Sequence, residues 1–178
     1  MTNPSNPKID AVLPLRMRDY ERFRIQEVSL RKFFADLGTL WIVVPDAEVA
    51  TFRSLIQYEQ YKVISEIALV PEFAAFPEKT NEFGGWFKQQ LIKLAITPKI
   101  TTAFYIALDA DIIWTKPVHY SDLVKNGRAG CFIWNSDGAS DSDMYAEWYE
   151  WAEKVLHLKN PRQHPKRNVV HNVTPVVL

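Results

Sequence analysis

Two aspartates separated by one residue follow an apolar run in the middle of the chain. The run is Phe104–Leu108, and Asp109 and Asp111 come directly after it. A short continuous apolar run is typical of a strand buried on both faces, as in the centre of an α/β sheet. Burying two unpaired carboxylates inside such a strand would cost on the order of several kcal/mol. We therefore expect both aspartates just past the carboxyl end of the strand, where open α/β sheets bind ligands.

The spacing of these two carboxylates suits a hard divalent cation. Because Asp109 and Asp111 are two positions apart around a tight turn, both can face one ion. Mg²⁺ or Mn²⁺ is typically held by one or two carboxylates together with substrate phosphates. The pattern predicts a divalent-cation site here, and the simpler alternative is a strand-end turn with two solvated acids.

The composition indicates one globular domain. The chain has 178 residues, of which 47% are hydrophobic and 13% aromatic, and this is ample for a core. Basic and acidic residues number 21 each, so the formal net charge is zero, which argues against a nucleic-acid binder. The single cysteine, Cys131, excludes an internal disulfide and a cysteine-rich zinc site.

No apolar run reaches the length of a membrane span, and the polar, proline-rich start is unlike a signal peptide, so we expect a cytoplasmic protein.

The elements that must position the aspartates alternate between strands and helices. We expect a disordered lead-in at residues 1–8 and a single domain over 9–178. The expected strands are Ile9–Leu15, Thr39–Val44 and Tyr61–Ser65, and the expected helices between them are 20–34 and 47–57, capped by Asp19 and Asp46. This alternation predicts a mostly parallel sheet flanked by helices.

Further features lie on both sides of the Asp-x-Asp strand. A long irregular connection is expected at 66–84, followed by a helix at Gly85–Ala95. The expected inner positions are Phe23, Val28, Leu30 and Phe34 in the first helix, and Leu91, Leu94 and Ala95 in this one. After Pro117 we expect a helical turn at 120–124, a strand at 129–134 and an aromatic-rich helix to about 156.

The carboxyl end of the chain has the pattern of a helix start. Thr174-Pro175 is a good N-cap and first helical position, yet only three residues follow. We therefore expect residues from about 157 onward to be mobile or to pack against a second copy of the chain, and we expect a truncated product or a fragment of a longer protein.

Three segments in order resemble the nucleotide-sugar glycosyltransferases of the GT-A fold. They are Gly84–Leu94, Phe104–Asp111 and His171–Pro175, and the likeness covers Ile9–Thr174. The likeness is to a group of bacterial and viral proteins with Gly-Trp-x-x-Gln-Gln ahead of Leu-Asp-x-Asp. It implies a GT-A-like α/β fold, a UDP- or GDP-sugar donor, a Mn²⁺ or Mg²⁺ cofactor, and a glycan or other hydroxyl acceptor. We expect the part of that fold that binds the acceptor to be short or missing here.

The helix before the Asp-x-Asp strand supplies further binding candidates. A metal that bridges the phosphates of the donor neutralises the leaving diphosphate, and Lys93 or Lys88 would add a fixed positive charge. Gln89 and Gln90 can hydrogen-bond sugar or ribose hydroxyls. Gln89 shares a helix face with Lys93, whereas Gln90 points elsewhere. The alternative is that the lysines are solvated and the glutamines are merely good helix formers.

The remaining candidates rest on position alone. Arg16 follows the first strand, Asp46 ends the second, and Trp86 belongs to the Gly-Trp motif, so these three join the nucleotide-sugar set. The loop acids Asp137, Asp141 and Asp143 are candidates for a catalytic base, and His171 for a late metal ligand. The alternatives are a surface arginine, plain caps, solvated loop acids and a structural histidine.

The resemblance and the aspartates together favour a metal-dependent glycosyltransferase. Two other classes stay open on the sequence alone. One is a metal-dependent nucleotidyl or phosphoryl transferase, which also uses aspartate-held metal. The other is a non-catalytic domain that binds a nucleotide or a sugar.

Overall fold

The computed structural model describes residues 7–75, 82–130, 154, 157 and 176–177. The chain divides into two compact units, residues 1–130 with 173–178, and residues 131–172. Nearly all of the second unit lies outside the described residues, so the fold below is that of the first. The predicted single domain over 9–178 stays a prediction.

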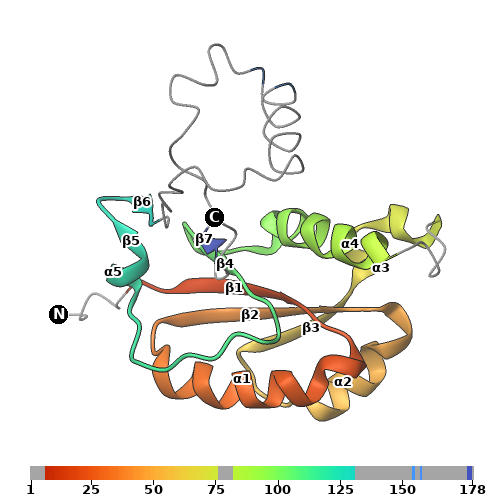
Figure 1. Ribbon diagram of the computed structural model, residues 1–178, viewed down its shortest axis with the longest axis horizontal. Coiled ribbons are helices and arrows are strands. Elements are labelled where there is room, and N and C mark those ends of the chain that lie inside the picture. Colours follow the sequence, from red (N-terminus) through yellow and green to blue (C-terminus); the bar gives the residue numbers. More distant parts are fainter. Residues whose placement is uncertain (1–6, 76–81, 131–153, 155–156, 158–175, 178) are drawn as a thin grey trace, which may run out of the picture. The chain divides into compact units, whose positions relative to one another are not determined.

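The described strands form one mostly parallel sheet and a short hairpin. Five strands pair in the order β3-β2-β1-β4-β7, and only β7 runs antiparallel to its neighbour (Figure 1). These strands are β1 (Ile9–Pro14), β2 (Leu37–Val44), β3 (Tyr61–Ser65), β4 (Tyr105–Ala107) and β7 (Val176–Val177). The sheet confirms the predicted α/β class, which is Rossmann-like with flanking helices, and the first four strands lie within two residues of their expected bounds.

Helices make the crossovers between the parallel strands. The described helices are α1 (Tyr20–Phe33), α2 (Val49–Leu55), α3 (Glu66–Leu69), α4 (Glu82–Ala95) and α5 (Tyr120–Leu123). Short 3-10 turns accompany them: η1 (Met17–Asp19), η2 (Asp46–Glu48), η3 (Pro71–Ala75) and η4 (Thr97–Lys99). After α5, β5 (Val124–Lys125) and β6 (Arg128–Ala129) form the hairpin, which turns at Asn126-Gly127 with φ of 52° and 70°. None of the described helices is long enough and apolar enough to cross a membrane.

The two faces of the sheet pack against different helices. In β1, Ala11 and Leu13 belong to a core cluster that includes residues of α1 and α2, whereas Val12 belongs to a cluster with Ile92 and Ile96 around α4. Figure 1 shows the same arrangement, with α1 and α2 on one face and α4 on the other. Because successive side chains of a strand point to opposite faces, strands covered on both sides read as continuous apolar runs.

Two predicted helix faces are wrong in detail. Val28 on α1 and Leu94 on α4 are exposed, although both were expected to face the core. Among the described side chains of α4 the buried ones are Ile92 and Lys93, while Leu91, which was expected inside, is half-buried and packs against the core. The expected inner face did not include Lys93, and the observed face is rotated relative to it. In the structure the buried ammonium group of Lys93 pairs with the partly exposed carboxylate of Asp109, and Leu94 faces solvent.

The predicted cap residues and the irregular connection also differ from the structure. Asp19 does precede α1, but its carboxylate makes no cap hydrogen bond and pairs with arginines instead. Asp46 lies inside η2, with Pro45 at the N-cap. The expected connection at 66–84 contains α3 and η3, because Ser65 caps α3 by accepting hydrogen bonds from two backbone amides. The helix α4 then begins at Glu82, before its expected start.

The chain end forms a strand where a helix start was expected. Val176 and Val177 pair antiparallel with Ala107 and Ile106 of β4. Three residues after a proline are too few for a helix, and β-branched valines favour an extended backbone.

The amino edge of the sheet holds a buried aspartate that is not among the sequence-based candidates. Asp10 Oδ1 accepts from the Thr39 amide at 2.8 Å, and Oδ2 accepts from the Thr101 amide at 2.9 Å and its hydroxyl at 3.1 Å. A Cβ on Gly38 would collide with Asp10 Oδ1, which explains the glycine there. Since both of its carboxylate oxygens are engaged, Asp10 is a structural link between β1, β2 and the start of the β4 segment.

Candidate functional site

The carboxyl ends of β1 and β4 lie at a topological switch point. From β1 the chain adds β2 and β3 on one side, then crosses to add β4 on the other side. The Leu108 amide still donates to the Val12 carbonyl at 2.8 Å, so Asp109 begins just beyond the paired region. Open α/β sheets bind ligands in the crevice at such a point. The structure therefore places Asp109 where the sequence predicted, past the strand, with Arg16 following the neighbouring β1.

Asp109 forms a close ion pair with Lys93 of α4. Lys93 Nζ lies 2.7 Å from Asp109 Oδ1, a short charge-assisted hydrogen bond. The lysine side chain is 9% exposed, whereas the aspartate side chain is 36% exposed. In this pair the carboxylate of Asp109 is partly exposed to solvent, whereas the ammonium group of Lys93 is buried. Both residues are among the sequence-based candidates.

Two buried side chains hold the backbone of this pair. The Tyr105 hydroxyl of β4 donates to the Lys93 carbonyl at 2.8 Å. The Gln26 amide of α1 donates to the Asp109 carbonyl at 2.7 Å. Neither residue is among the sequence-based candidates. One signal pointed to Gln26, a polar residue three positions after Phe23 and four before Leu30, on the apolar face of α1.

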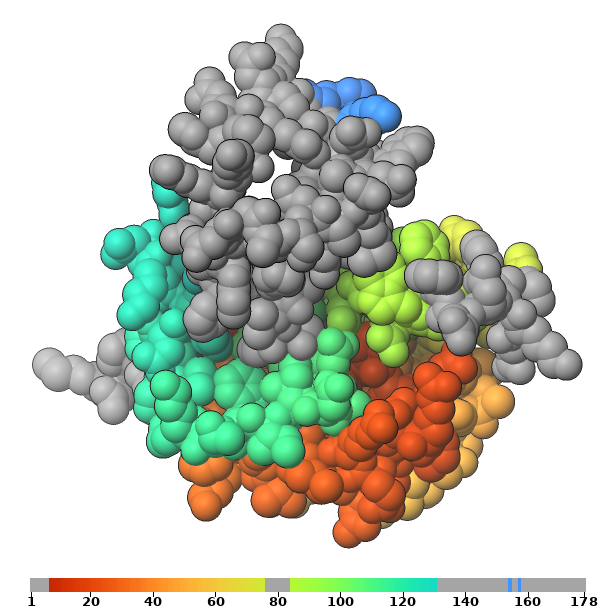
Figure 2. Space-filling view, in the orientation of Figure 1, coloured from red at the N-terminus to blue at the C-terminus, as the bar shows by residue number. Residues whose placement is uncertain are grey.

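The segment after Asp109 runs along α1. The Trp114 amide donates to Ser29 Oγ at 3.1 Å, and the Val118 amide donates to the Phe33 carbonyl at 2.8 Å. In Figure 2 this segment, drawn in green, lies against α1, drawn in red to orange. Because the segment is held to α1, it leaves the carboxyl end of β4 instead of folding back over Asp109.

The donor atoms at this turn fit a hard cation that also binds phosphate. Within the described residues, Asp109 Oδ2 and the exposed Asp111 carboxylate make no hydrogen bond or ion pair. The described part of the chain brings together no group of three or more His, Cys, Asp or Glu that could hold a metal. Two carboxylates are what Mg²⁺ or Mn²⁺ takes from a protein when phosphates and waters complete its shell.

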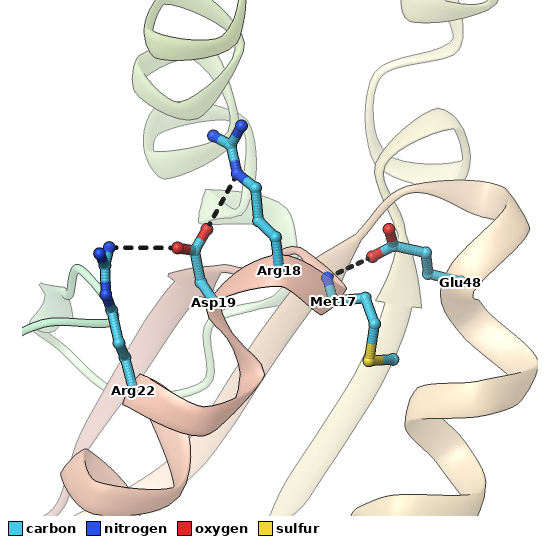
Figure 3. A network of polar contacts seen from close by, with 5 residues as sticks. All are labelled: Met17, Arg18, Asp19, Arg22 and Glu48. Atoms are coloured by element: carbon cyan, nitrogen blue, oxygen red, sulfur yellow. Dashed lines mark hydrogen bonds and ion pairs between the residues drawn. The ribbon is translucent and has the colours of Figure 1, made fainter.

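Arginines surround the end of β1. Arg16 is half-buried and its guanidinium makes no hydrogen bond or ion pair within the described residues. Figure 3 shows Asp19 between Arg18 and Arg22, with both N···O distances 3.3 Å. It also shows the Glu48 carboxylate accepting from the Met17 amide, at 2.8 Å, which ties η1 to η2. Asp46 is exposed nearby at the end of β2.

The candidates on α4 follow one stripe of the helix. Trp86, Gln89, Gln90 and Lys93 occupy positions i, i+3, i+4 and i+7, which span about 100° of the helix surface. Gln89 and Gln90 are half-buried and lie on either side of the line from Trp86 to Lys93. Both glutamines therefore belong to the stripe that leads to Asp109, including Gln90, which was expected to point elsewhere.

Lys88, the alternative to Lys93, is engaged elsewhere. Its Nζ lies 3.3 Å from Glu66 Oε1 and 5.1 Å from the centre of the Phe73 ring. Both side chains of the ion pair are enclosed, at 13% and 12% exposure. Lys88 thus links α4 to the start of α3 and does not reach the Asp109 turn.

The perturbed titratable groups of the described residues lie outside this site. Burial raises the pKa of the Glu27 carboxyl, an effect that Arg31 and Arg24 partly offset. Burial, together with the nearby Glu27 charge, raises the pKa of the Tyr61 phenol. Tyr61 is the first residue of β3, so it stands at the amino edge of the sheet, opposite to Asp109.

Several sequence-based candidates lie outside the described residues. They are Asp137, Asp141, Asp143 and His171, together with most of the strand expected at 129–134 and of the helix expected to end near 156.

The chain belongs to a family of unknown function, DUF6492, whose model matches residues 6–178. No curated protein matches it in sequence. Among solved structures it is similar to the glycosyltransferase GlyE of Streptococcus pneumoniae TIGR4. The apo form matches with 13% identity over 84% of this chain and 39% of that one, at a TM-score of 0.42. A second GlyE structure matches with 15% identity over 89% and 40%, at 0.43.

The chain is also similar to mannosyl-3-phosphoglycerate synthase from Rubrobacter xylanophilus. The identity is 16% over 65% of this chain and 33% of that one, with a TM-score of 0.35. The chain therefore spans two fifths or less of each of these three solved chains.

Proposed function

We propose that this chain is the donor-binding part of a metal-dependent glycosyltransferase that uses a nucleoside-diphosphate sugar. One observation carries the proposal. At the switch point between β1 and β4, Asp109 presents a half-open carboxylate that is held 2.7 Å from an enclosed lysine and is followed by the exposed Asp111. Negative carboxylates beside a fixed positive charge suit a cation and a diphosphate together.

Each candidate then has a role toward the donor. Asp109 and Asp111 would hold Mn²⁺ or Mg²⁺, which when bound neutralises charge on the leaving diphosphate as a Lewis acid. Lys93 stands beside them as a fixed cation, and Arg16 supplies a second one from β1. In the stripe on α4, the Gln89 and Gln90 amides hydrogen-bond hydroxyl groups of the donor.

The remaining roles are assigned by position. Trp86 lies at the start of the stripe and offers an aromatic face to the donor, and Asp46 at the end of β2 contacts the nucleoside. The acceptor is a glycan or another hydroxyl compound. We seek the catalytic base among Asp137, Asp141 and Asp143, with His171 as a further metal ligand.

Titration with nucleotides tests the proposal. UDP, GDP and CMP are each titrated by calorimetry, with and without Mn²⁺, and donor turnover is then followed with the UDP- or GDP-sugar of the bound nucleotide. We expect binding of a nucleoside diphosphate that requires Mn²⁺, and release of the sugar. Turnover of a nucleoside triphosphate would favour a nucleotidyl or phosphoryl transferase. Binding without sugar transfer or hydrolysis would favour a non-catalytic domain.

A further inference from the structure

We propose that Lys93 makes the cation and the diphosphate bind cooperatively, by opposing the cation when it binds alone. The inference rests on the proposed function and concerns how the same site is controlled. Its basis is the 2.7 Å contact between Lys93 Nζ and Asp109 Oδ1.

The ammonium group has little freedom to leave Asp109. Lys93 is buried, its backbone carbonyl is bound by Tyr105, and the backbone carbonyl of Asp109 is bound by Gln26. Both partners are thus held at the backbone by side chains from β4 and α1. A buried ammonium that moved away would lose its charge partner, which is costly in an enclosed position. The pair is therefore the resting state of the site.

This resting state disfavours a cation that binds alone. The charge of Asp109 is already balanced by Lys93, so Asp111 is the only uncompensated carboxylate that the described part of this turn offers. An ion on Asp109 Oδ2 would also lie close to the ammonium on Oδ1 and be repelled by it. Divalent cation alone should consequently bind weakly.

A diphosphate reverses this balance. Its oxygens carry several negative charges and can contact the ammonium and the cation at once, so repulsion between two positive groups becomes attraction to a shared anion. Cation and diphosphate then each increase the affinity of the site for the other, and by thermodynamic linkage the two increases are equal. The site fills when both ligands are present.

The experiment measures Mn²⁺ alone, by calorimetry and by the electron paramagnetic resonance signal of the free ion. In Lys93→Met the repulsion is gone, and we expect Mn²⁺ to bind at least roughly tenfold more tightly than in the wild-type protein. Lys93→Gln keeps a hydrogen-bond donor without the charge, and its Mn²⁺ affinity should also be higher than that of the wild type. Lys93→Arg, which keeps the charge, should bind Mn²⁺ as the wild type does. Thermal unfolding identifies which variants are folded.

The chain offers a matched control on the same helix. Lys88→Met/Glu66→Gln removes the other lysine–carboxylate pair of α4 without leaving either charge unpaired. Its Mn²⁺ affinity should equal that of the wild type. Adding Asp109→Asn to Lys93→Met should abolish the gain. If the folded Lys93→Met and Lys93→Gln variants bind Mn²⁺ no more tightly than the wild type, the proposal is overturned.

A second arm adds the nucleotide. In the wild-type protein Mn²⁺ should increase the affinity for UDP or GDP at least roughly tenfold, and in Lys93→Met this coupling should shrink. A coupling that is unchanged in Lys93→Met overturns the inference. A wild-type protein that binds neither UDP nor GDP overturns the proposed function. If it binds them with Mn²⁺ and Lys93→Met gains no Mn²⁺ affinity, the coupling alone is wrong.

Discussion

Two lysine–carboxylate pairs on the same helix have different exposures. Lys88 pairs with Glu66 just after β3, and Lys93 pairs with Asp109 just after β4. The first contact is 3.3 Å and both of its side chains are nearly enclosed, whereas the second is 2.7 Å and its carboxylate is 36% exposed. The Lys88–Glu66 pair is thus part of the packing between α4 and α3, whereas the Lys93–Asp109 pair leaves its carboxylate accessible to solvent.

The difference comes from the chain that follows each strand. After β3, Ser65 caps α3 at once, and Glu66 is buried in the first turn of that helix. After β4, the turn at Ala110 and Asp111 leads into a segment that α1 holds away, through Gln26 and Ser29. A carboxylate at a strand end is open to a ligand only where the next segment leaves it accessible.

The largest effect is expected from Lys88. Lys88→Met leaves Glu66 enclosed without its cation, and breaking such a buried pair should lower the free energy of unfolding by about 3 kcal/mol. Urea denaturation measures the loss. Lys88→Met/Glu66→Gln should recover most of it, and equal stability of the single and double variants would show that the pair is not a structural one.

Lys93 should instead affect ligand binding. If Lys93 contacts the diphosphate as proposed, Lys93→Ala removes a charge-assisted contact, typically about 1.5–3 kcal/mol, so nucleoside diphosphate affinity should fall roughly ten- to hundredfold. Affinity for the plain nucleoside should change little, because it lacks the phosphates. Calorimetry with Mn²⁺ present compares the two ligands, and equal small losses for both would place Lys93 outside the binding site.

Gln26 should have a smaller effect on the same ligand. Gln26→Leu removes the hydrogen bond to the Asp109 carbonyl, so the turn loses a positioning contact and Mn²⁺-dependent nucleotide binding should weaken roughly tenfold or less. Leu30→Val is the control, since it disturbs a buried position of the same helix whose side chain makes no hydrogen bond. Equal losses in both variants would mean that general disturbance of α1 is responsible.

After Glu66 and Asp109, Glu27 is the third carboxylate to consider, and the smallest effect on stability is expected from it. Burial raises its pKa in the folded protein above the ordinary value of 4.5, so the folded state holds this proton more tightly than the unfolded state. The charged form is disfavoured on folding, and stability is lost as the pH rises through the window above 4.5. The Glu27→Gln variant should therefore be slightly more stable than the wild type at pH 7, and it should not be more stable at pH 4. Thermal unfolding at the two pH values measures this, and a gain that is larger at pH 4 would contradict it.

The sequence predicted the strands and the position of Asp109 because both depend on local pattern. Four apolar runs became β1 to β4, and the acids fell just past the last of them. The sequence did not predict the burial of Lys93 or Gln26, because each depends on a partner distant in the chain. Lys93 and Asp109 are 16 residues apart, and Gln26 and Asp109 are 83 apart. The polarity of one residue does not reveal such a partner, and this is why the inner face of α4 was assigned wrongly.

The most direct test is Mn²⁺-dependent binding of UDP and GDP to Asp109→Asn, compared with Glu66→Gln. Both variants replace a lysine-paired carboxylate at a strand end by its neutral amide. We expect Asp109→Asn to remain folded and to lose Mn²⁺-dependent binding, because its carboxylate is the open one. A folded Glu66→Gln protein should keep wild-type affinity. Unchanged affinity in a folded Asp109→Asn protein would contradict the assignment of the site.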